Sequence, residues 1–369
     1  MFERSQILFV HLFNNYSGSP AVLHQVILAC LQVGLPCRLL IGNNGGILDD
    51  LPVECHCFNY RYFTNKFLTL GYYLFTQLQM FLKVLSLACK NDTVYINTML
   101  PFGAALAAKL RGCHVIYHIH EINVRPLLLK KILRWIIELT ADQVFHVSQT
   151  LYESERFHKP KQLVVYNALS PEFEAKALAM QPEFALKLFN VLMICSPKAY
   201  KGVFEFVKLA ASCCNQKNLH FILVLGAEVG EISGFLSGTK IPENLMVYPC
   251  SQDVFPFYRL SHLVLNLSHP EQCVETFGLT VLEAMACGIP VIVPPIGGPT
   301  ELVDDGVQGF QVDSRNSQKL LNSVLQLSTD HMLYRKMSQA CRERAAHFSS
   351  ACFAKKIATA IDHDRDPCA

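Results

Sequence analysis

The chain has 369 residues, a formal net charge of +2, and a composition that is 51% hydrophobic but only 17% charged. This length favours two domains, while the composition excludes long disordered regions and the small net charge gives no electrostatic case for nucleic-acid binding. Fifteen cysteines are scattered along the chain, and the closest group, Cys55, His56 and Cys57, lacks a second ligand pair at zinc spacing. We therefore expect free thiols, a reducing cytosolic setting and no metal site.

The N-terminal half alternates between strand and helix patterns. It begins with the apolar run QILFVHLF at residues 6–13, which predicts a first strand and not a signal peptide. The loop NNYSGSP and a helix pattern ending at Gly34 follow, and further helices and strands continue to QVFHVS at residues 143–148. Strands joined by helices predict a parallel sheet with right-handed crossovers. No run approaches the ~18 apolar residues of a membrane-spanning helix.

The C-terminal half restarts the same alternation with the strand pattern FNVLMICS at residues 189–196. Nearly continuous apolar strands indicate sheets buried on both faces, so we predict two doubly wound α/β domains. Ligands of such sheets bind beyond the carboxyl ends of the strands, which places function in a cleft between the domains. The predicted boundaries are 1–168 for the first domain, 169–188 for a linker, 189–345 for the second domain, and 346–369 for a C-terminal helix that could cross back to the first.

The segment VETFGLTVLEAMACGIPVIVPPIGGPTELVDDG at residues 274–306 carries two glutamates eight residues apart. Its pattern predicts a helix from about residue 277 to 287, whose N-terminal N–H groups suit an anion such as a diphosphate. Glu275 lies just before this helix, and Glu283 lies roughly 7 to 8 Å further along the axis. That spacing suits a nucleotide-sugar, which has hydroxyls at both ends and phosphates between them. The alternative is structural: Thr280 and Glu283 form a capping box, and Glu275 is a solvated loop charge.

This segment resembles the E-x7-E signature of retaining glycosyltransferase family 4, including a following Gly-Gly-x-x-E element at Gly297, Gly298 and Glu301. The segments MICSPKAYKGVFEFVKLA, VVYNALS, YHIHE and DDGVQGFQVD resemble other parts of that family, so the likeness covers most of residues 6–348. The resemblance implies a GT-B fold of two Rossmann-like domains facing a central cleft. In that family the first domain binds the acceptor and the second binds the nucleotide-sugar donor.

The resemblance also implies roles for individual residues. Glu275 would contact the donor sugar, Glu283 the ribose hydroxyls, and Lys201 the donor diphosphate, where a point charge is well suited. The backbone at Phe277 and Gly278, with the neighbouring Thr276, would hold the phosphate oxygens.

A histidine of the first domain would face the donor sugar. His120 follows the strand pattern VIYHIH, and Glu121 beside it matches the family's histidine-acid pair. His118 points the same way in a strand of period two, so either histidine could serve, and we favour His120.

Two positions depart from the family pattern. The usual Gly-Arg pair is replaced by Cys195 and Ser196, so Ser196 would lie at the donor site and one cationic contact is missing unless Lys198 substitutes for the arginine. The first loop offers only Gly18 where the family has paired glycines, although the backbone ahead of the helix could still approach a sugar or phosphate.

The expected function is therefore retaining transfer of a sugar from a UDP- or GDP-sugar to an acceptor hydroxyl, with catalytic roles for His120, Glu275 and Lys201. The acceptor would be a glycan or lipid-linked glycan of a bacterial surface polysaccharide such as O-antigen, capsule or exopolysaccharide. We expect no metal or other cofactor. The alternative is a non-catalytic nucleotide-sugar-binding protein of the same fold. A dehydrogenase is disfavoured because no G-x-G-x-x-G follows a first strand.

Two segments of the first domain suggest contact with an anionic membrane at the inner face of the plasma membrane. Residues 125–140 place Lys130, Lys131 and Arg134 beside the only tryptophan, and residues 59–85 are aromatic and free of acidic side chains. The apolar stripe of the first segment consists of Leu128, Ile132 and Ile136. The alternative is that both helices simply pack on the first sheet.

Overall fold

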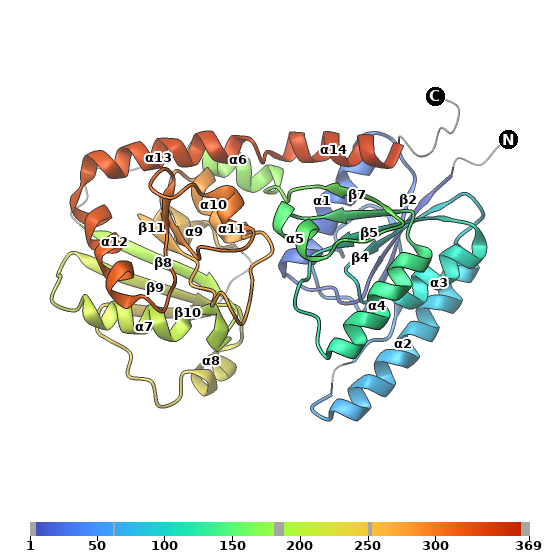
Figure 1. Ribbon diagram of the computed structural model, residues 1–369, viewed down its shortest axis with the longest axis horizontal. Helices are drawn as coiled ribbons and strands as arrows, with labels where there is room; N and C mark the ends of the chain where they lie inside the picture. The colour runs from blue at the N-terminus through green and yellow to red at the C-terminus, as the bar shows by residue number, and fades with distance from the viewer. Residues whose placement is uncertain (1–4, 62, 181–187, 250–252, 363–369) are drawn as a thin grey trace. The chain divides into compact units, whose positions relative to one another are not determined.

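The computed structural model describes residues 5–61, 63–180, 188–249 and 253–362. The chain divides into two compact units, one formed by residues 1–167 with 351–369 and the other by residues 168–350. Each unit contains one parallel sheet with helices on it, so the prediction of two doubly wound α/β domains is confirmed (Figure 1). None of the described helices is both long and apolar enough to span a bilayer.

The sheet of the first unit has the strand order β3-β2-β1-β4-β5-β6-β7, with every pair parallel. The strands are β1 (Ile7–His11), β2 (Cys37–Gly42), β3 (Glu54–Phe58), β4 (Thr93–Asn97), β5 (His114–Ile119), β6 (Gln143–His146) and β7 (Lys161–Val164). All five residues of β1 and of β4 are buried, as expected for central strands covered on both faces. Successive strands are added toward one edge of the sheet from β1 to β3 and toward the other edge from β4 to β7. The carboxyl ends of β1 and β4 are therefore the switch point where such sheets bind ligands.

The helices of the first unit are α1 (Gly18–Gln32), α2 (Lys66–Leu87), α3 (Phe102–Arg111), α4 (Leu127–Thr140), α5 (Gln149–Ser154) and α14 (Ser350–Asp362). Helix α3 packs between α2 and α4, and the three lie side by side (Figure 1). The small residues of α3 allow this close approach: a Cβ on Gly103 would lie 2.1 Å from the carbonyl oxygen of Gln77 in α2. Helix α14 lines a cavity of about 460 Å³ with β7.

The second unit has a six-stranded parallel sheet in the order β10-β9-β8-β11-β12-β13. The strands are β8 (Phe189–Cys195), β9 (Leu219–Leu225), β10 (Leu245–Pro249), β11 (Leu263–Leu265), β12 (Val291–Val293) and β13 (Gly309–Gln311). The order in which strands are added to the sheet reverses between β8 and β11, so the switch point of this sheet lies at the carboxyl ends of these two strands.

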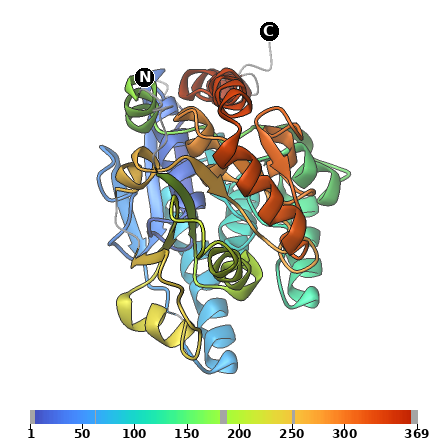
Figure 2. The ribbon, with the colours of Figure 1, turned by 90° about the vertical axis from the view of Figure 1, so that its left-hand side faces the viewer.

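The helices of the second unit are α6 (Pro171–Ala179), the 3-10 turn η1 (Ala199–Lys201), α7 (Val203–Ser212), α8 (Val229–Phe235), α9 (Phe255–Arg259), α10 (Leu279–Ala286), α11 (Pro299–Leu302), α12 (Ser317–Thr329) and α13 (His331–Ala346). Helices α7 and α12 lie side by side (Figure 2), and their apolar faces share one core with the strands. Right-handed crossovers place α7 and α10 on opposite faces, because β8 leads to β9 and β11 leads to β12 in opposite directions. Helix α6 falls in the segment expected as a linker, of which residues 181–187 lie outside the described residues.

Candidate active site

The loop after β8 carries the lysine that the sequence singles out. Its turn is closed by two backbone bonds, from Lys198 N to the Ser196 oxygen at 2.8 Å and from Lys201 N to the Lys198 oxygen at 3.0 Å. Gly202 then adopts the left-handed conformation with φ 81°, and a Cβ there would lie 2.3 Å from the Leu267 oxygen. Glycine therefore lets the lysine loop pass directly over the end of β11.

Lys201 and Glu275 form an ion pair at this switch point. The Lys201 Nζ lies 2.6 Å from Glu275 Oε2, and each side chain is 21% exposed. Ser268 Oγ donates to the same carboxylate oxygen at 3.2 Å. Burial alone would lower the pKa of Lys201, but the attraction of Glu275 outweighs it and the pKa is raised. Glu275 is therefore a paired charge and not a solvated loop residue.

Two glycines hold the loop that carries Glu275. Gly298 N donates to the backbone carbonyl oxygen of Glu275 at 2.8 Å. A Cβ on Gly297 would lie 2.6 Å from the same carbonyl oxygen, and a Cβ on Gly298 would lie 2.2 Å from the backbone carbonyl oxygen of Thr276. Any larger residue at either position would displace this loop, so the Gly-Gly turn of the motif fixes where Glu275 lies. Thr276 is half-buried and Phe277 is buried.

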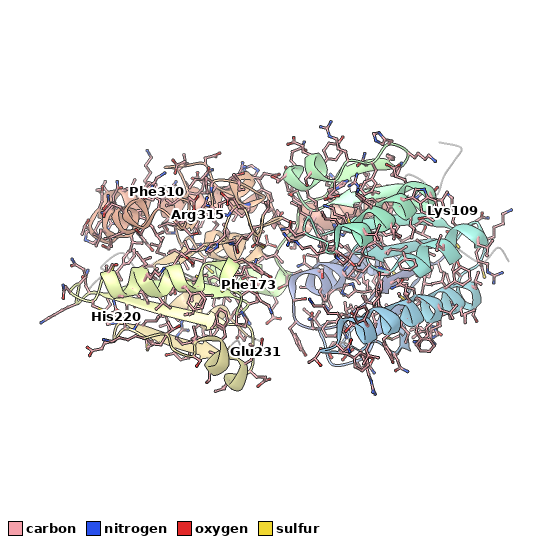
Figure 3. The ribbon with its side chains drawn as sticks, turned by 60° about the horizontal axis from the view of Figure 1, so that its bottom comes forward. Lys109, Phe173, His220, Glu231, Phe310 and Arg315 are labelled. Carbon is pink, nitrogen blue, oxygen red and sulfur yellow. The ribbon has the colours of Figure 1, made fainter. Side chains whose placement is uncertain are left out.

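Helix α10 begins after Gly278, which has φ 101° and no side-chain cap. The capping box of Thr280 with Glu283 is therefore wrong. Glu283 instead accepts a hydrogen bond of 2.5 Å from the Tyr258 hydroxyl of α9. Burial raises the pKa of Glu283 to about 7, and the Tyr258 bond partly opposes this rise. Phe173 of α6, labelled in Figure 3, lies on the second unit. Its ring packs edge-on against the Tyr258 ring, with 5.7 Å between centroids.

The remaining predicted donor-site positions differ in exposure. Ser196 is half-buried and Lys198 is exposed, so of the two lysines in this loop Lys201 is the one held inside the site. Two thiols lie within electrostatic range of Lys201, namely Cys195 and Cys273. Burial raises the pKa of both, to about 12 for Cys195, so both remain neutral thiols. Sequence reasoning noted Cys195 only as a departure from the family and missed Cys273.

The switch point of the first unit holds a hydrogen-bonded network of neutral side chains. Asn97, at the end of β4, donates from Nδ2 to the Ser19 oxygen at 3.0 Å and to His11 Nδ1 at 3.2 Å. Its Oδ1 lies 2.8 Å from His120 Nε2. Because this oxygen can only accept, His120 must carry its proton on Nε2, which leaves Nδ1 as its acceptor nitrogen. The same amide thus ties His120 to the start of α1, where Gly18 is the first residue.

The structure separates the two histidines that the sequence left open. His118 is completely buried and its Nδ1 lies 2.8 Å from the Tyr95 hydroxyl. Burial lowers the pKa of His118 to about 3 and lowers that of His120 well below its usual value. His118 is a core residue, whereas the half-buried His120 is the candidate for ligand contact.

Glu121 supports the backbone at His120. Its Oε2 accepts hydrogen bonds from the backbone N–H groups of His120 at 3.2 Å and of Met99 at 3.4 Å. Burial raises the pKa of this carboxyl to about 7. Nearby, Thr98 adopts φ 78°, a conformation that costs energy for a residue with a branched side chain. Such strain is concentrated at functional sites, in agreement with this position at the switch point.

Sequence reasoning missed three of these residues. Asn97, His11 and Tyr258 each act through a partner that is far away in the sequence, and the only local signal was a polar residue ending an apolar strand in the first two cases. Among the described residues, no group of three or more His, Cys, Asp or Glu side chains is arranged to hold a metal ion.

Comparisons with known proteins match the C-terminal half of the chain to a family model. Residues 180–345 match the family model of glycosyl transferases group 1. N-acetyl-alpha-D-glucosaminyl L-malate synthase of Bacillus anthracis is 25% identical over 268 residues, which is 68% of this chain and 69% of that protein. Sucrose synthases also match, but over segments that are only 5% to 12% of their own length.

Solved structures agree over nearly the whole chain. Anabaena HepE in complex with UDP and glucose superposes with a TM-score of 0.79 at 21% identity, covering 97% of this chain and 100% of that one. A trehalose-6-phosphate synthase, studied for glycosyl transfer with retention, superposes with a TM-score of 0.73 at 12% identity, covering 97% and 99%. At these identities the likeness establishes the fold, and it confirms the predicted GT-B class. Residues 180–345 thus match the model of a glycosyl transferases group 1 domain, and the chain is a glycosyltransferase with the GT-B fold.

Proposed function

We propose that this enzyme transfers a sugar, with retention of configuration, from a UDP- or GDP-sugar to an acceptor hydroxyl. The observation that carries the proposal is the Lys201–Glu275 ion pair at the β8/β11 switch point, next in the chain to the start of α10. It brings together a cation for a diphosphate and a carboxylate for a sugar at the position where sheets of this kind bind ligands.

Each residue has a distinct chemical task in this proposal. Lys201 and the first N–H groups of α10 stabilise the charge that grows on the leaving diphosphate. The ion pair keeps Lys201 protonated and in place before the donor arrives. Glu275 contacts the sugar, and Glu283 accepts hydrogen bonds from the ribose hydroxyls. With retention, the donor phosphate itself accepts the proton of the acceptor hydroxyl, so neither a separate base nor a metal ion is required.

Known complexes support a nucleotide-sugar donor. HepE has been solved with UDP and with UDP-glucose, and its fold matches this chain across both units. The trehalose-6-phosphate synthase work on retention supports the stereochemical part of the proposal. In the first unit, His120 offers a neutral Nδ1 acceptor that suits an uncharged sugar hydroxyl.

For the acceptor we propose a glycan or lipid-linked glycan of a bacterial surface polysaccharide, with the enzyme acting on the cytoplasmic side. The lysine loop at residues 193–210 resembles the lysine loops of transferases that build lipid-linked O-antigen or capsule chains, and this resemblance supports the choice. The N-acetyl-alpha-D-glucosaminyl L-malate synthase of Bacillus anthracis, by its name, makes a product that contains a small acid, so a small hydroxylated acceptor is the competing outcome.

A two-stage experiment tests the function. Thermal unfolding in the presence of a panel of nucleotide-sugars identifies the donor, because a ligand at 100 times its Kd stabilises the folded state by about 2.7 kcal/mol. Release of UDP or GDP with candidate acceptors then measures turnover, and NMR of the product gives the anomeric configuration. We expect one donor to stabilise the protein, and the product to keep the donor's configuration. Stabilisation without release under any acceptor condition would favour a binding protein, and an inverted product would refute retention.

A further inference from the structure

The exposed apolar surface of this protein is concentrated on two helices of the first unit. Among the described residues, 27 large hydrophobic side chains are exposed, and 12 of them lie on α2 and α4. The most exposed of these 12 side chains are Phe67 at 87%, Leu127 at 71% and Leu128 at 69%. Single exposed apolar residues are ordinary, but a gathering of this kind marks an interaction surface. We call the exposed faces of α2 and α4 the α2/α4 face.

The position of the α2/α4 face relates it to the candidate site. Helix α2 begins after β3 and helix α4 begins after β5, so both helices start at the carboxyl edge of the first sheet. Phe67, Leu127 and Leu128 all lie in the first turn of their helix. The most apolar part of the face is therefore at the same edge of the sheet as His120 and Asn97. Figure 1 shows α2, α3 and α4 side by side along this layer.

The structure changes which cations can serve this face. Lys130 and Arg134, expected to meet a membrane, both form ion pairs with the buried carboxylate of Glu155. Arg134 also lies over the Phe157 ring, 4.6 Å from its centroid. These two cations neutralise a buried acid and are not available to a partner, contrary to the expectation. Ile136 is likewise buried, so the apolar stripe of α4 turns inward there.

The cations that remain give the face one sign of charge. Exposed lysines and arginines flank it at both helix starts, namely Arg61, Lys66, Arg125 and Lys131. Residues 59–88 contain no acidic residue, and Glu138 is the only acid of α4. That carboxylate accepts hydrogen bonds from the backbone N–H groups of His158 at 2.8 Å and Lys159 at 3.1 Å. The α2/α4 face is thus apolar and cationic.

The positive charge of the α2/α4 face favours an anionic lipid surface over a second copy of this chain as its partner. In a two-fold contact between copies of this chain, each cationic rim would meet another cationic rim with almost no acid to pair it. An anionic lipid surface satisfies both features, because side chains such as Phe67 and Trp135 enter the headgroup layer while Lys66 and Lys131 meet its charge. Trp135 is 64% exposed, and tryptophan favours this level of a bilayer.

We propose that the α2/α4 face docks the enzyme peripherally on an anionic lipid bilayer. The inference deepens the proposed function, since a lipid-linked acceptor would then be held at the sheet edge that carries His120. Docking needs neither donor nor turnover, so it can be tested separately from catalysis.

Vesicle co-sedimentation of the full chain, without donor, tests the docking. The vesicles are either zwitterionic phosphatidylcholine alone or phosphatidylcholine mixed with phosphatidylglycerol. We expect wild type to sediment with the anionic vesicles at low ionic strength. The variant Phe67→Asp/Leu128→Asp should bind at least tenfold more weakly. Lys66→Gln/Lys131→Gln should lose about fivefold for each cation, and this loss should shrink as salt rises.

The matched control is Val229→Asp/Met332→Asp, which adds two acids at exposed apolar residues of the second unit. It should sediment as wild type does. Thermal unfolding midpoints equal to that of wild type show that all variants are folded.

Absence of wild-type sedimentation with anionic vesicles at low salt refutes the proposal, as does equal loss in the control. Concentration-dependent dimerisation abolished by Phe67→Asp/Leu128→Asp would instead assign the face to a second copy. Docking without sugar transfer would sustain this inference while contradicting the proposed function.

Discussion

The two switch points of this protein are built from opposite kinds of polar chemistry. In the second unit the centre is an ion pair, Lys201 with Glu275, which the Ser268 hydroxyl contacts and which has two neutral thiols within electrostatic range. In the first unit the centre is an uncharged network in which Asn97 joins His11 and His120, and burial keeps the imidazoles neutral. The topology is equivalent, but only the second site is prepared for a charged ligand.

The difference follows from what each kind of group can stabilise. A cation is effective against a diphosphate whose charge grows as the sugar leaves, and it is of little use for neutral hydroxyls. Neutral imidazole and amide groups offer directional donors and acceptors without the cost of burying a charge. We infer that the second unit supplies most of the charge stabilisation and that the first unit supplies orientation. The following predictions test this division.

The largest effect is expected for Lys201→Ala. Removing the cation should lower kcat/KM by roughly 10² to 10³, because its interaction strengthens as charge develops in the transition state. Steady-state kinetics measure this effect, with kcat falling as well as KM rising. Lys198→Ala is the control from the same loop, and since Lys198 is exposed we expect less than about a tenfold change. A rise in KM with unchanged kcat would show that Lys201 only binds the donor.

Glu283→Gln should have the next largest effect. Loss of a charged acceptor for the ribose hydroxyls should weaken donor binding by roughly 1.5 to 3 kcal/mol. Calorimetric titration of the donor measures this change. The side chain keeps its size and its contact with Tyr258, so the thermal unfolding midpoint should fall little. Unchanged donor affinity in the folded variant would remove Glu283 from the ribose site.

The site of the second unit also shows how much can be predicted from sequence alone. The alternation of apolar strands and helices predicted both parallel sheets, and the motif at residues 274–306 predicted the glycosyltransferase class. The proximity of Lys201 and Glu275, 74 residues apart, came from the family resemblance, since no local pattern encodes it.

Other partners were hidden for the same physical reason. Lys130 and Arg134 have the spacing of an exposed basic face, yet both turn toward Glu155, a carboxylate 25 and 21 residues later in the chain. Asn97 reads as the polar end of a strand, and its bond to His120 arises only when β4 and β5 pair. Local periodicity reports which face is apolar, but not which polar groups meet across the fold.

A smaller effect is expected for Asn97→Ala. Without the amide oxygen, His120 loses the acceptor that holds its proton on Nε2, so the tautomer that presents Nδ1 as an acceptor is no longer favoured. Turnover should fall roughly tenfold, as for loss of about one buried hydrogen bond, while donor affinity changes little. Nitrogen-15 NMR of the histidine rings reads the tautomer directly.

Tyr95→Phe provides the control for Asn97→Ala, because its hydroxyl contacts His118 and not His120. It should leave the His120 tautomer and the turnover unchanged. An Asn97→Ala variant that keeps both the Nε2–H signal and the wild-type rate would show that the amide does not position the histidine.

The smallest effect is expected for Tyr258→Phe, and it should depend on pH. Burial raises the pKa of Glu283 to about 7, and the Tyr258 hydroxyl favours the ionised form through its hydrogen bond. Because the ribose hydroxyls need a carboxylate acceptor, donor affinity should rise as pH increases through this pKa and level off above it. Without the hydroxyl the pKa of Glu283 rises further, so the midpoint should move upward by about one pH unit. The variant should then bind the donor several-fold more weakly near pH 7, and as wild type does once Glu283 is fully ionised.

Calorimetric titrations across pH measure the midpoint. Glu283→Gln should abolish the pH dependence, which separates it from the Glu121 carboxyl of the first unit, whose pKa is also about 7. Tyr248→Phe controls for loss of a tyrosine hydroxyl elsewhere in the second unit. A midpoint that stays in place in Tyr258→Phe, or a pH dependence that survives in Glu283→Gln, would mean that another group controls donor binding.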